Sequence, residues 1–274
     1  MKKMKLLTLS LTAFLAVNLN ALSLDEAVSI ALKNNFEIQG KNYDYLESLE
    51  NINSVNSNNL PKLDAVYGFT NTDKPNIGYE SDEAVASIAL SYNLFNGFKD
   101  ISLKESSKYL SLSSQHGLNA TKQDIVLNTK TAYINYLDKK NALETYNSAY
   151  ILFQEQYEDS KHRYEQGLIA KNDLLQVQVN MSNAKQNVVK AQGDLKISSF
   201  TLSNILGGMD LSKEKIEDLD EKSLQSFTYN EELLENRSEI QALLLNLKSI
   251  KELEKSTNSG YYPKIDATVS HNKY

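Results

Sequence analysis

The residues best suited to metal or acid–base chemistry are Glu158 and His162, which stand four positions apart and would share one face of a helix. A carboxylate and an imidazole at this spacing are compatible with a metal ion, but the neighbouring sequence offers no third ligand, which favours a plain surface pair. The other histidines, His116 and His271, stand alone, and cysteine is absent. The chain also lacks a phosphate-binding glycine loop and a Gly-x-Ser-x-Gly nucleophile motif. These observations predict no enzyme activity, no metal site and no cofactor.

The elements that would carry any functional surface are organised by a duplication. The segment LPKLDAVYGF, which begins at Leu60, returns as YPKIDATVSH at Tyr262, and EIQ at Glu37 returns at Glu239, each 202 residues later. This period is far longer than the roughly 20–50 residues of a solenoid repeat, so the repeated unit is the size of a domain. The duplication divides the chain into a first structural repeat (22–208), a connector (209–237) and the start of a second repeat whose remainder is missing (238–274).

The first 21 residues have the layout of a cleavable secretory signal peptide. Three lysines precede an apolar run, Leu6–Val17, and Ala21 is small enough for a cleavage site. The alternative is a retained membrane anchor, for which the apolar run is short. Cleavage would leave 26 basic against 35 acidic residues, a net charge of −9, which argues against a nucleic-acid partner. No later stretch has 18 continuous apolar residues, so entry into a membrane would require strands of a closed barrel.

Most of the chain is expected to be helical, because it has 3 prolines, 10 glycines and long runs of helix-forming residues. Ser23 and Glu26 form a capping-box pattern, and further helix is expected over 37–57 and from Ser238. A long antiparallel hairpin is predicted over about 99–206, broken near Gly167. Its second helix carries a seam at alternating steps of three and four, typical of a left-handed coiled coil: Leu174, Val177, Met181, Ala184, Val188, Ala191, Leu195 and, with Ser198 between them, Leu202. Tyrosines at heptad spacing in the first helix, such as Tyr146 and Tyr157, are interpreted as seam packing in preference to a ligand site.

Two segments, 62–72 and 84–95, alternate between apolar and polar residues with the period of two that a β-strand requires. Each approaches the roughly 9–11 residues that a tilted strand needs to cross a bilayer. Two strands alone are unstable in water, so more strands must come from elsewhere. The apolar residues predicted to face lipid are Leu63, Tyr67, Phe69, Ile88, Leu90, Tyr92 and Leu94.

In order along the chain, these segments resemble the TolC-type outer-membrane efflux proteins. The resemblance is carried by LSLDEAVSIALKNN, LPKLDAVYGF, LSYNLFNGF, RYEQGLIAKNDLLQVQVNMSNAKQNVVKAQGDL and NILGG. It implies a mainly α fold with β, in which long coiled-coil hairpins form a periplasmic tunnel and strands from three subunits form one outer-membrane barrel. It also implies that LPKLDA and YPKIDA open the first and third of four strands per subunit.

The resemblance places the periplasmic tip, where adaptor proteins dock and the closed tunnel narrows, at the turn between the paired helices. The residues that match this turn are Arg163, Gly167, Leu168 and Asp173. Three of them have a simpler alternative: Gly167 as a helix end, Asp173 as a first-turn acid and Arg163 as a solvated charge, which leaves Leu168 as the better docking candidate. Gln166 departs from the apolar residue that the family often has before the glycine.

The sequence thus predicts a homotrimeric outer-membrane exit duct that extends into the periplasm. Its partners would be a periplasmic adaptor, an inner-membrane transporter and outer-membrane lipid. One alternative is a soluble periplasmic coiled-coil adaptor or scaffold. Another is a non-functional fragment, since a chain with part of a third strand leaves edges and seams open.

Overall fold

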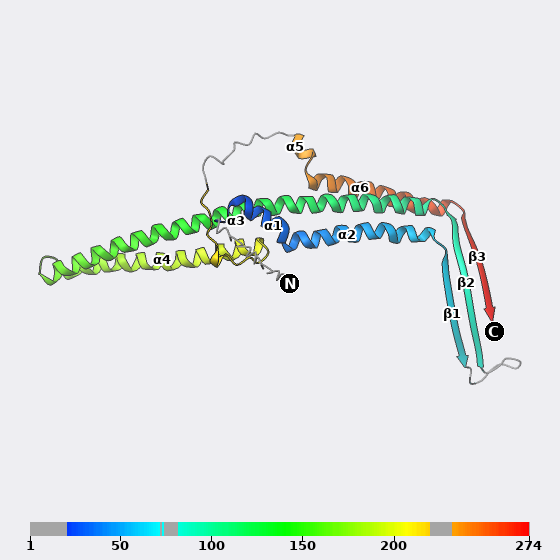
Figure 1. Cartoon of the computed structure of the whole chain (residues 1–274), viewed down its shortest axis with the longest axis horizontal. Helices are drawn as coiled ribbons and strands as arrows, with labels where there is room; N and C mark the ends of the chain where they lie inside the picture. The colour runs from blue at the N-terminus through cyan, green and yellow to red at the C-terminus, as the bar shows by residue number, and fades with distance from the viewer. Residues whose placement is uncertain (1–20, 72, 74–81, 220–231, 274) are drawn as a thin grey trace, which may run out of the picture. The chain divides into compact units, whose positions relative to one another are not determined.

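The computed structural model describes residues 21–71, 73, 82–219 and 232–273 (Figure 1). The signal-peptide prediction, apart from Ala21, lies outside the described residues, as do residue 72 and the middle of the connector. The helices are α1 (Leu24–Asn34), α2 (Phe36–Asn56), α3 (Lys99–Glu165), α4 (Lys171–Ile205), α5 (Glu232–Glu235) and α6 (Ser238–Thr257). The strands are β1 (Lys62–Asn71), β2 (Asp82–Asn96) and β3 (Lys264–Lys273), and 3₁₀ turns occupy Ser57–Asn59, Leu211–Lys213 and Asn258–Tyr261. The predicted combination of long helical hairpins with antiparallel strands is confirmed.

The helix ends follow from local sequence. The predicted capping box of α1 is present, because the Ser23 N–H donates to Glu26 Oε2 at 3.0 Å and the Glu26 N–H donates to Ser23 Oγ at 3.3 Å. Asn35 caps α2, its Oδ1 accepting the N–H groups of Glu37 and Ile38. These side chains satisfy N–H groups that a helix start would otherwise leave unpaired.

The duplication is visible in the element boundaries. α2 begins at Phe36 and α6 at Ser238, while β1 begins at Lys62 and β3 at Lys264, so both pairs are offset by the same 202 residues. Each helix is followed by a 3₁₀ turn, a proline and a ten-residue strand. Insertion or deletion has therefore not disturbed this part of the repeat.

The strands form one antiparallel sheet in the order β1-β2-β3, with β2 in the centre. Leu63 pairs with Leu90 on one side of β2, and Val269 pairs with Leu90 on the other. A β-bulge interrupts the β2–β3 pairing between Asn93 and Phe95. The third strand is therefore a second partner of β2, not a continuation of the hairpin.

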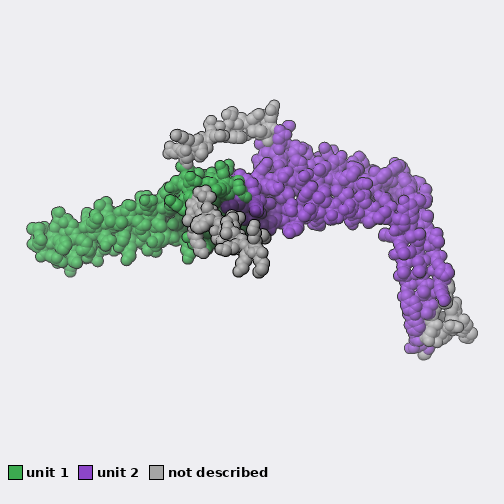
Figure 2. Space-filling model, in the orientation of Figure 1, with its two compact units in different colours: residues 1–29, 130–224 green, residues 30–129, 225–274 purple. Residues whose placement is uncertain are grey.

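The chain divides into two compact units, one of residues 1–29 and 130–224 and the other of residues 30–129 and 225–274 (Figure 2). The division falls within α3 and so differs from the boundaries predicted from the repeat. The first unit has an apolar core that includes Leu137, Leu202 and Leu206. In the second, α2 and α6 run alongside the first part of α3 (Figure 1), and the buried contacts include a 3.0 Å hydrogen bond between Ser106 Oγ and Ser249 Oγ.

Candidate membrane-facing sheet and helical tip

The sheet separates apolar from polar side chains across its three strands. Residues that pair across strands lie on the same face, so the register joins Leu63, Tyr67 and Phe69 of β1 to Ile88, Leu90 and Tyr92 of β2 and to Ala267 and Val269 of β3. Near its end β3 also places two polar residues on this face, because His271 pairs with Ile88 and Lys273 pairs with Ala86. The opposite face is mostly polar or small and carries Lys62, Asp64, Ser87, Ser91, Asn93, Thr268 and Ser270, with Val66 and Val85 as its larger apolar residues. All seven residues predicted to face lipid are exposed, from 39% at Tyr92 to 72% at Tyr67. We call the first of these faces the apolar face and the second the polar face.

In the central strand, β2, the two faces also differ in exposure, whereas every residue of β1 and β3 is exposed on both faces. Along β2, the apolar-face residues from Ala84 to Leu94 are exposed, whereas the alternate residues from Val85 to Asn93 are half-buried. A sheet in water would normally bury the apolar side and expose the polar one. In β2, therefore, the more exposed side is the apolar one.

The sheet also has two open edges. Within the part of the chain that the structure describes, β1 and β3 each pair with β2 alone, so the far edge of each is without a neighbouring strand. Such edges present rows of backbone donors and acceptors to any further strand.

The junction of the strands with the helices is built around Gly97 and Phe98, which sequence analysis did not single out. Both have positive φ, 58° and 66°. A Cβ on Gly97 would lie 2.6 Å from the backbone oxygen of Ser259, so no side chain fits there. Phe98 packs edge-to-face against Phe95 at 5.1 Å and against Tyr262 at 5.5 Å between ring centroids. The Asn96-Gly97 pair after an alternating run was the available signal, since this dipeptide favours positive φ.

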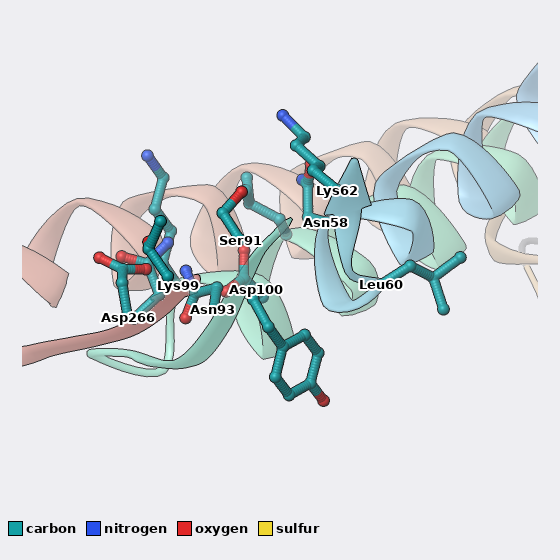
Figure 3. A pocket seen from close by; sticks show the side chains of 12 residues that line it. Asn58, Leu60, Lys62, Ser91, Asn93, Lys99, Asp100 and Asp266 are labelled. Atoms are coloured by element: carbon teal, nitrogen blue, oxygen red, sulfur yellow. The ribbon is translucent and has the colours of Figure 1, made fainter. Parts of the chain in front are cut away.

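A pocket of about 490 Å³ opens where the polar face meets the start of α3. Figure 3 shows Lys99, Asp100, Asn93 and Asp266 close together at this pocket, which Lys62 and Ser91 also line. Two lysines and two aspartates make its lining polar and balanced in charge. Among the described residues no three metal-ligating side chains gather anywhere. The pocket is therefore a polar recess beside the polar face, and its lining does not gather the donors of a metal centre.

The predicted seam residues share one side of α4. Ala184, Val188, Ala191 and Leu202 are buried, and Leu174, Val177, Met181 and Leu195 are half-buried, while the positions between them are mostly exposed. In α3, Phe153 and Tyr157 are half-buried, but Tyr146 and Tyr164 are exposed. The aromatic residues at heptad spacing in α3 are thus only partly buried.

The four predicted tip residues gather around the turn between α3 and α4. Gly167 has a φ of 75°, its N–H donates to Tyr164 O, and the Leu168 N–H donates to Arg163 O, the two bonds of a Schellman helix end. Asp173 Oδ2 accepts the N–H of Ala170 at 3.3 Å, and Arg163 pairs with Asp159 at 2.9 Å. Leu168 is 69% exposed. Three of the four residues therefore have a local structural role, whereas Leu168 contributes only its backbone N–H to the turn and leaves its side chain exposed.

The spacing of Glu158 and His162 predicted a plain surface pair, but the carboxylate nearest to His162 is that of Glu165. His162 Nδ1 lies 3.7 Å from Glu165 Oε2, and both side chains are exposed. The geometry is that of a weak surface contact.

Tyr133 is a buried polar anchor that sequence analysis also missed. Its hydroxyl lies 2.8 Å from the carbonyl oxygen of Leu22 and 2.7 Å from that of Glu217, and it can donate to one of them at a time. Leu22 also forms a parallel bridge with Ile216. Burial, together with the charges of Glu217 and Asp218, raises the pKa of Tyr133 to about 12. The hydroxyl thus joins the start of the described chain and the connector to α3.

None of the helices in the described residues is long and apolar enough to cross a membrane.

Residues 27–208 match the protein family described as outer membrane efflux protein. The chain belongs to this family. It is 26% identical over 271 residues to outer membrane protein TolC of Escherichia coli (strain K12), across 97% of this chain and 54% of TolC. The chain spans about half the length of the curated relatives it matches. The resemblance predicted from the sequence is confirmed, and the outer membrane efflux family is one of transport proteins, not enzymes.

Solved structures share the fold of this chain. The Campylobacter jejuni CmeC outer membrane channel superposes with a TM-score of 0.75 at 18% identity, over 91% of this chain and 61% of that chain. The structure of CusC gives a TM-score of 0.75 at 17% identity, over 91% of this chain and 60% of that chain.

Proposed function

We propose that this chain supplies part of a passive exit duct through the outer membrane, in which strands from three copies close into one barrel and the paired helices continue it into the periplasm. The observation that carries this proposal is the sheet whose apolar face is exposed along all three strands. The most economical environment for such a face is lipid, which removes exposed apolar area from water. The opposite, polar face would then line a water-filled passage.

The open edges of the sheet support assembly from several copies. In a bilayer, each unpaired backbone group costs several kcal/mol, so strands cross only as parts of a closed barrel. Three described strands are too few to close one, since membrane barrels start at about eight strands. Further strands must therefore join both edges.

The helical tip is the proposed contact for a periplasmic adaptor that couples the duct to an inner-membrane transporter. Leu168 supports this assignment, because it is a large apolar side chain exposed at a turn where its neighbours have local partners. Export by the N-terminal segment and residence in the outer membrane belong to the same proposal.

The test compares two neighbouring substitutions on β2. Ile88→Lys places a charge on the apolar face, and Ser87→Lys places the same charge on the polar face. A lysine facing lipid near the bilayer midplane costs about 2–4 kcal/mol, whereas a lysine facing the lumen changes selectivity. We expect Ile88→Lys to abolish carbonate-resistant membrane association and trimer formation, and Ser87→Lys to keep both while altering conductance in planar bilayers.

A soluble adaptor or scaffold would behave differently. Carbonate would release the unmodified chain, and Ile88→Lys and Ser87→Lys would have similar effects. That result, with no conductance from the purified protein, would overturn the proposal.

A further inference from the structure

Charged residues of the polar face gather at one end of the sheet, where the strands meet the helices. The duplicated segments LPKLDA and YPKIDA place a lysine two residues before an aspartate at the start of both β1 and β3. Among the strand residues whose side chains the structure describes, the polar face has no charged residue from Val66 to Thr70, from Val85 to Asn93 or from Thr268 to Asn272. We call six residues the charged belt: Lys62 and Asp64 of β1, Lys264 and Asp266 of β3, and Lys99 and Asp100 at the start of α3.

The register of the sheet brings opposite charges of the charged belt close to one another. Asp266 is the partner of Asn93 in β2. Two residues away on the same face of β2, Ser91 is the partner of Lys62. A negative and a positive residue therefore lie in successive rows of the polar face. Figure 3 shows Lys99 near Asp266 at the pocket that Lys62 also lines.

The strand residues of the charged belt are exposed and contribute little to holding the sheet together. Every residue of β1 and β3 is exposed. The side chains of Lys264 and Asp266 are 59% and 48% exposed, and their charged atoms lie 3.8 Å apart. An exposed ion pair of this kind adds little to stability. The stability of the sheet therefore does not account for the same pair of charges in both repeats.

The charged belt is balanced in charge, with three lysines and three aspartates. A ring of carboxylates in a pore favours cations, whereas a ring of lysines favours anions. On each strand, the lysine and the aspartate are two residues apart, a rise of about 6.6 Å. This separation is shorter than the Debye length of about 10 Å at 0.1 M salt. The fields of the two signs therefore largely cancel for an ion that passes the charged belt.

We propose that the charged belt determines the ion selectivity of the passage, and that its balance of charge lets cations and anions pass to a similar extent. This inference rests on the proposed function, because it requires the polar face to line a water-filled passage formed by several copies. Three copies would each contribute the Lys-x-Asp pairs of β1 and β3, so the charged belt would encircle the passage where these strands begin. Removal of one sign from both pairs would leave the other sign uncompensated all round the passage.

The test removes one sign at a time and measures which ions pass. Asp64→Asn combined with Asp266→Asn leaves the lysines of both strands uncompensated, and Lys62→Gln combined with Lys264→Gln does the same for the aspartates. The matched control is Lys273→Gln, which removes a lysine from the apolar face of β3. Each full-length variant is inserted into planar bilayers between about 0.03 M and 0.1 M potassium chloride, where screening is weak. The reversal potential gives the permeability ratio of potassium to chloride.

Because the substituted strand residues are exposed, all variants should keep carbonate-resistant membrane association and trimer formation. We expect a permeability ratio within about twofold of one for the unmodified protein and for Lys273→Gln. The double aspartate variant should lower the ratio, and the double lysine variant should raise it, each by at least about threefold.

Conductance with an unchanged ratio in both double variants would overturn the role of the charged belt and leave the proposed function intact. Changes of the same sign in both would also overturn it, because they would report an altered pore shape and not an altered charge. A change caused by Lys273→Gln alone would overturn the assignment of both faces. Absence of conductance from the unmodified protein would overturn the proposed function itself.

Discussion

Two of the turns that are built on a glycine with positive φ, at Gly97 and at Gly167, differ in what surrounds the glycine. Gly97, between β2 and α3, would clash with Ser259 if it carried a side chain, whereas Gly167, between α3 and α4, has no atom within 4 Å of the corresponding position. The first turn is enclosed by a segment more than 150 residues later in the chain, and the second is satisfied by its own helix end. The same backbone conformation is therefore covered by a distant segment in one place and is exposed in the other. We call the turn at Gly97 the locked turn and the turn at Gly167 the open turn.

The difference indicates that the two turns have separate roles. A locked turn transmits a fixed geometry from helices to strands, because any change must also displace the turn that precedes β3. An open turn leaves its side chains available to another molecule. The predictions below test this contrast, from the largest expected effect to the smallest.

The locked turn is most sensitive to Gly97→Ala. A left-handed alanine and a forced backbone shift together should lower the free energy of unfolding by about 2–4 kcal/mol. Gly117→Ala is the matched control, because Gly117 lies inside α3 with space for a methyl group, and helix propensity should raise stability by about 0.5–1 kcal/mol. Thermal unfolding of the extracted protein measures both variants. An equal, small change in the stability of both variants would mean that the segment around Ser259 does not restrict Gly97.

The buried hydroxyl of Tyr133 also fixes distant segments to each other, in this case without a glycine. Tyr133→Phe should lower stability by about 1–2 kcal/mol, because a carbonyl oxygen loses its donor in a buried site. Tyr146→Phe, which removes an exposed hydroxyl from the same helix, should stay within about 0.5 kcal/mol of the unmodified protein. Denaturant unfolding at pH 8 separates the two variants. Equal midpoints would mean that the hydroxyl adds nothing to the packing of the ring.

The same hydroxyl predicts a pH dependence. The pKa of Tyr133 is about 12 in the folded chain against an ordinary value of 10.0, so the folded state retains the proton longer than the unfolded state. Its stabilising contribution should be complete below pH 10 and disappear as the pH rises through 12. The difference in unfolding midpoint between the unmodified protein and Tyr133→Phe should shrink over this range. A constant difference would contradict the raised pKa.

The open turn should tolerate substitution better. Gly167→Ala retains the left-handed strain but meets no neighbouring atom, so the expected loss is about 1 kcal/mol, smaller than at Gly97. Differential scanning fluorimetry of the two alanine variants side by side gives the comparison directly. A loss at Gly167 as large as that at Gly97 would show that the tip is enclosed in the assembled protein.

The smallest effect on stability, and a large one on function, is expected at Leu168. Its side chain is exposed, so Leu168→Ser should change stability by less than about 0.5 kcal/mol. If the open turn is the adaptor contact, the variant should reach the outer membrane at normal levels and fail to crosslink to the adaptor in the cell. Gln166→Ser, at the neighbouring exposed position, is the control. Normal crosslinking of Leu168→Ser to the adaptor would remove this residue from the proposed contact.

Several elements were predictable because their causes are local. The capping box at Ser23 and Glu26, the strand that follows Pro61 and the seam of α4 all arise from residues within one or two turns of each other. Their repeat partners followed from the constant offset. The lock at Gly97 was not predictable, because Asn96-Gly97 reports on backbone conformation and not on which distant segment will cover it. The division of α3 between two compact units was equally hidden, since the sequence of α3 shows no break.

By itself, the sequence determined the helices and strands, the duplicated start of two repeats, the apolar and polar faces of the sheet and the family. The tertiary structure alone decided that β3 pairs with the second edge of β2, that Ser259 closes over Gly97, and that Tyr133 joins Leu22 to Glu217. The physical reason is the separation along the sequence between the residues that interact. Periodicity and capping depend on residues a few positions apart, whereas these contacts join segments about 80–190 residues apart, whose meeting is governed by the packing of the whole chain.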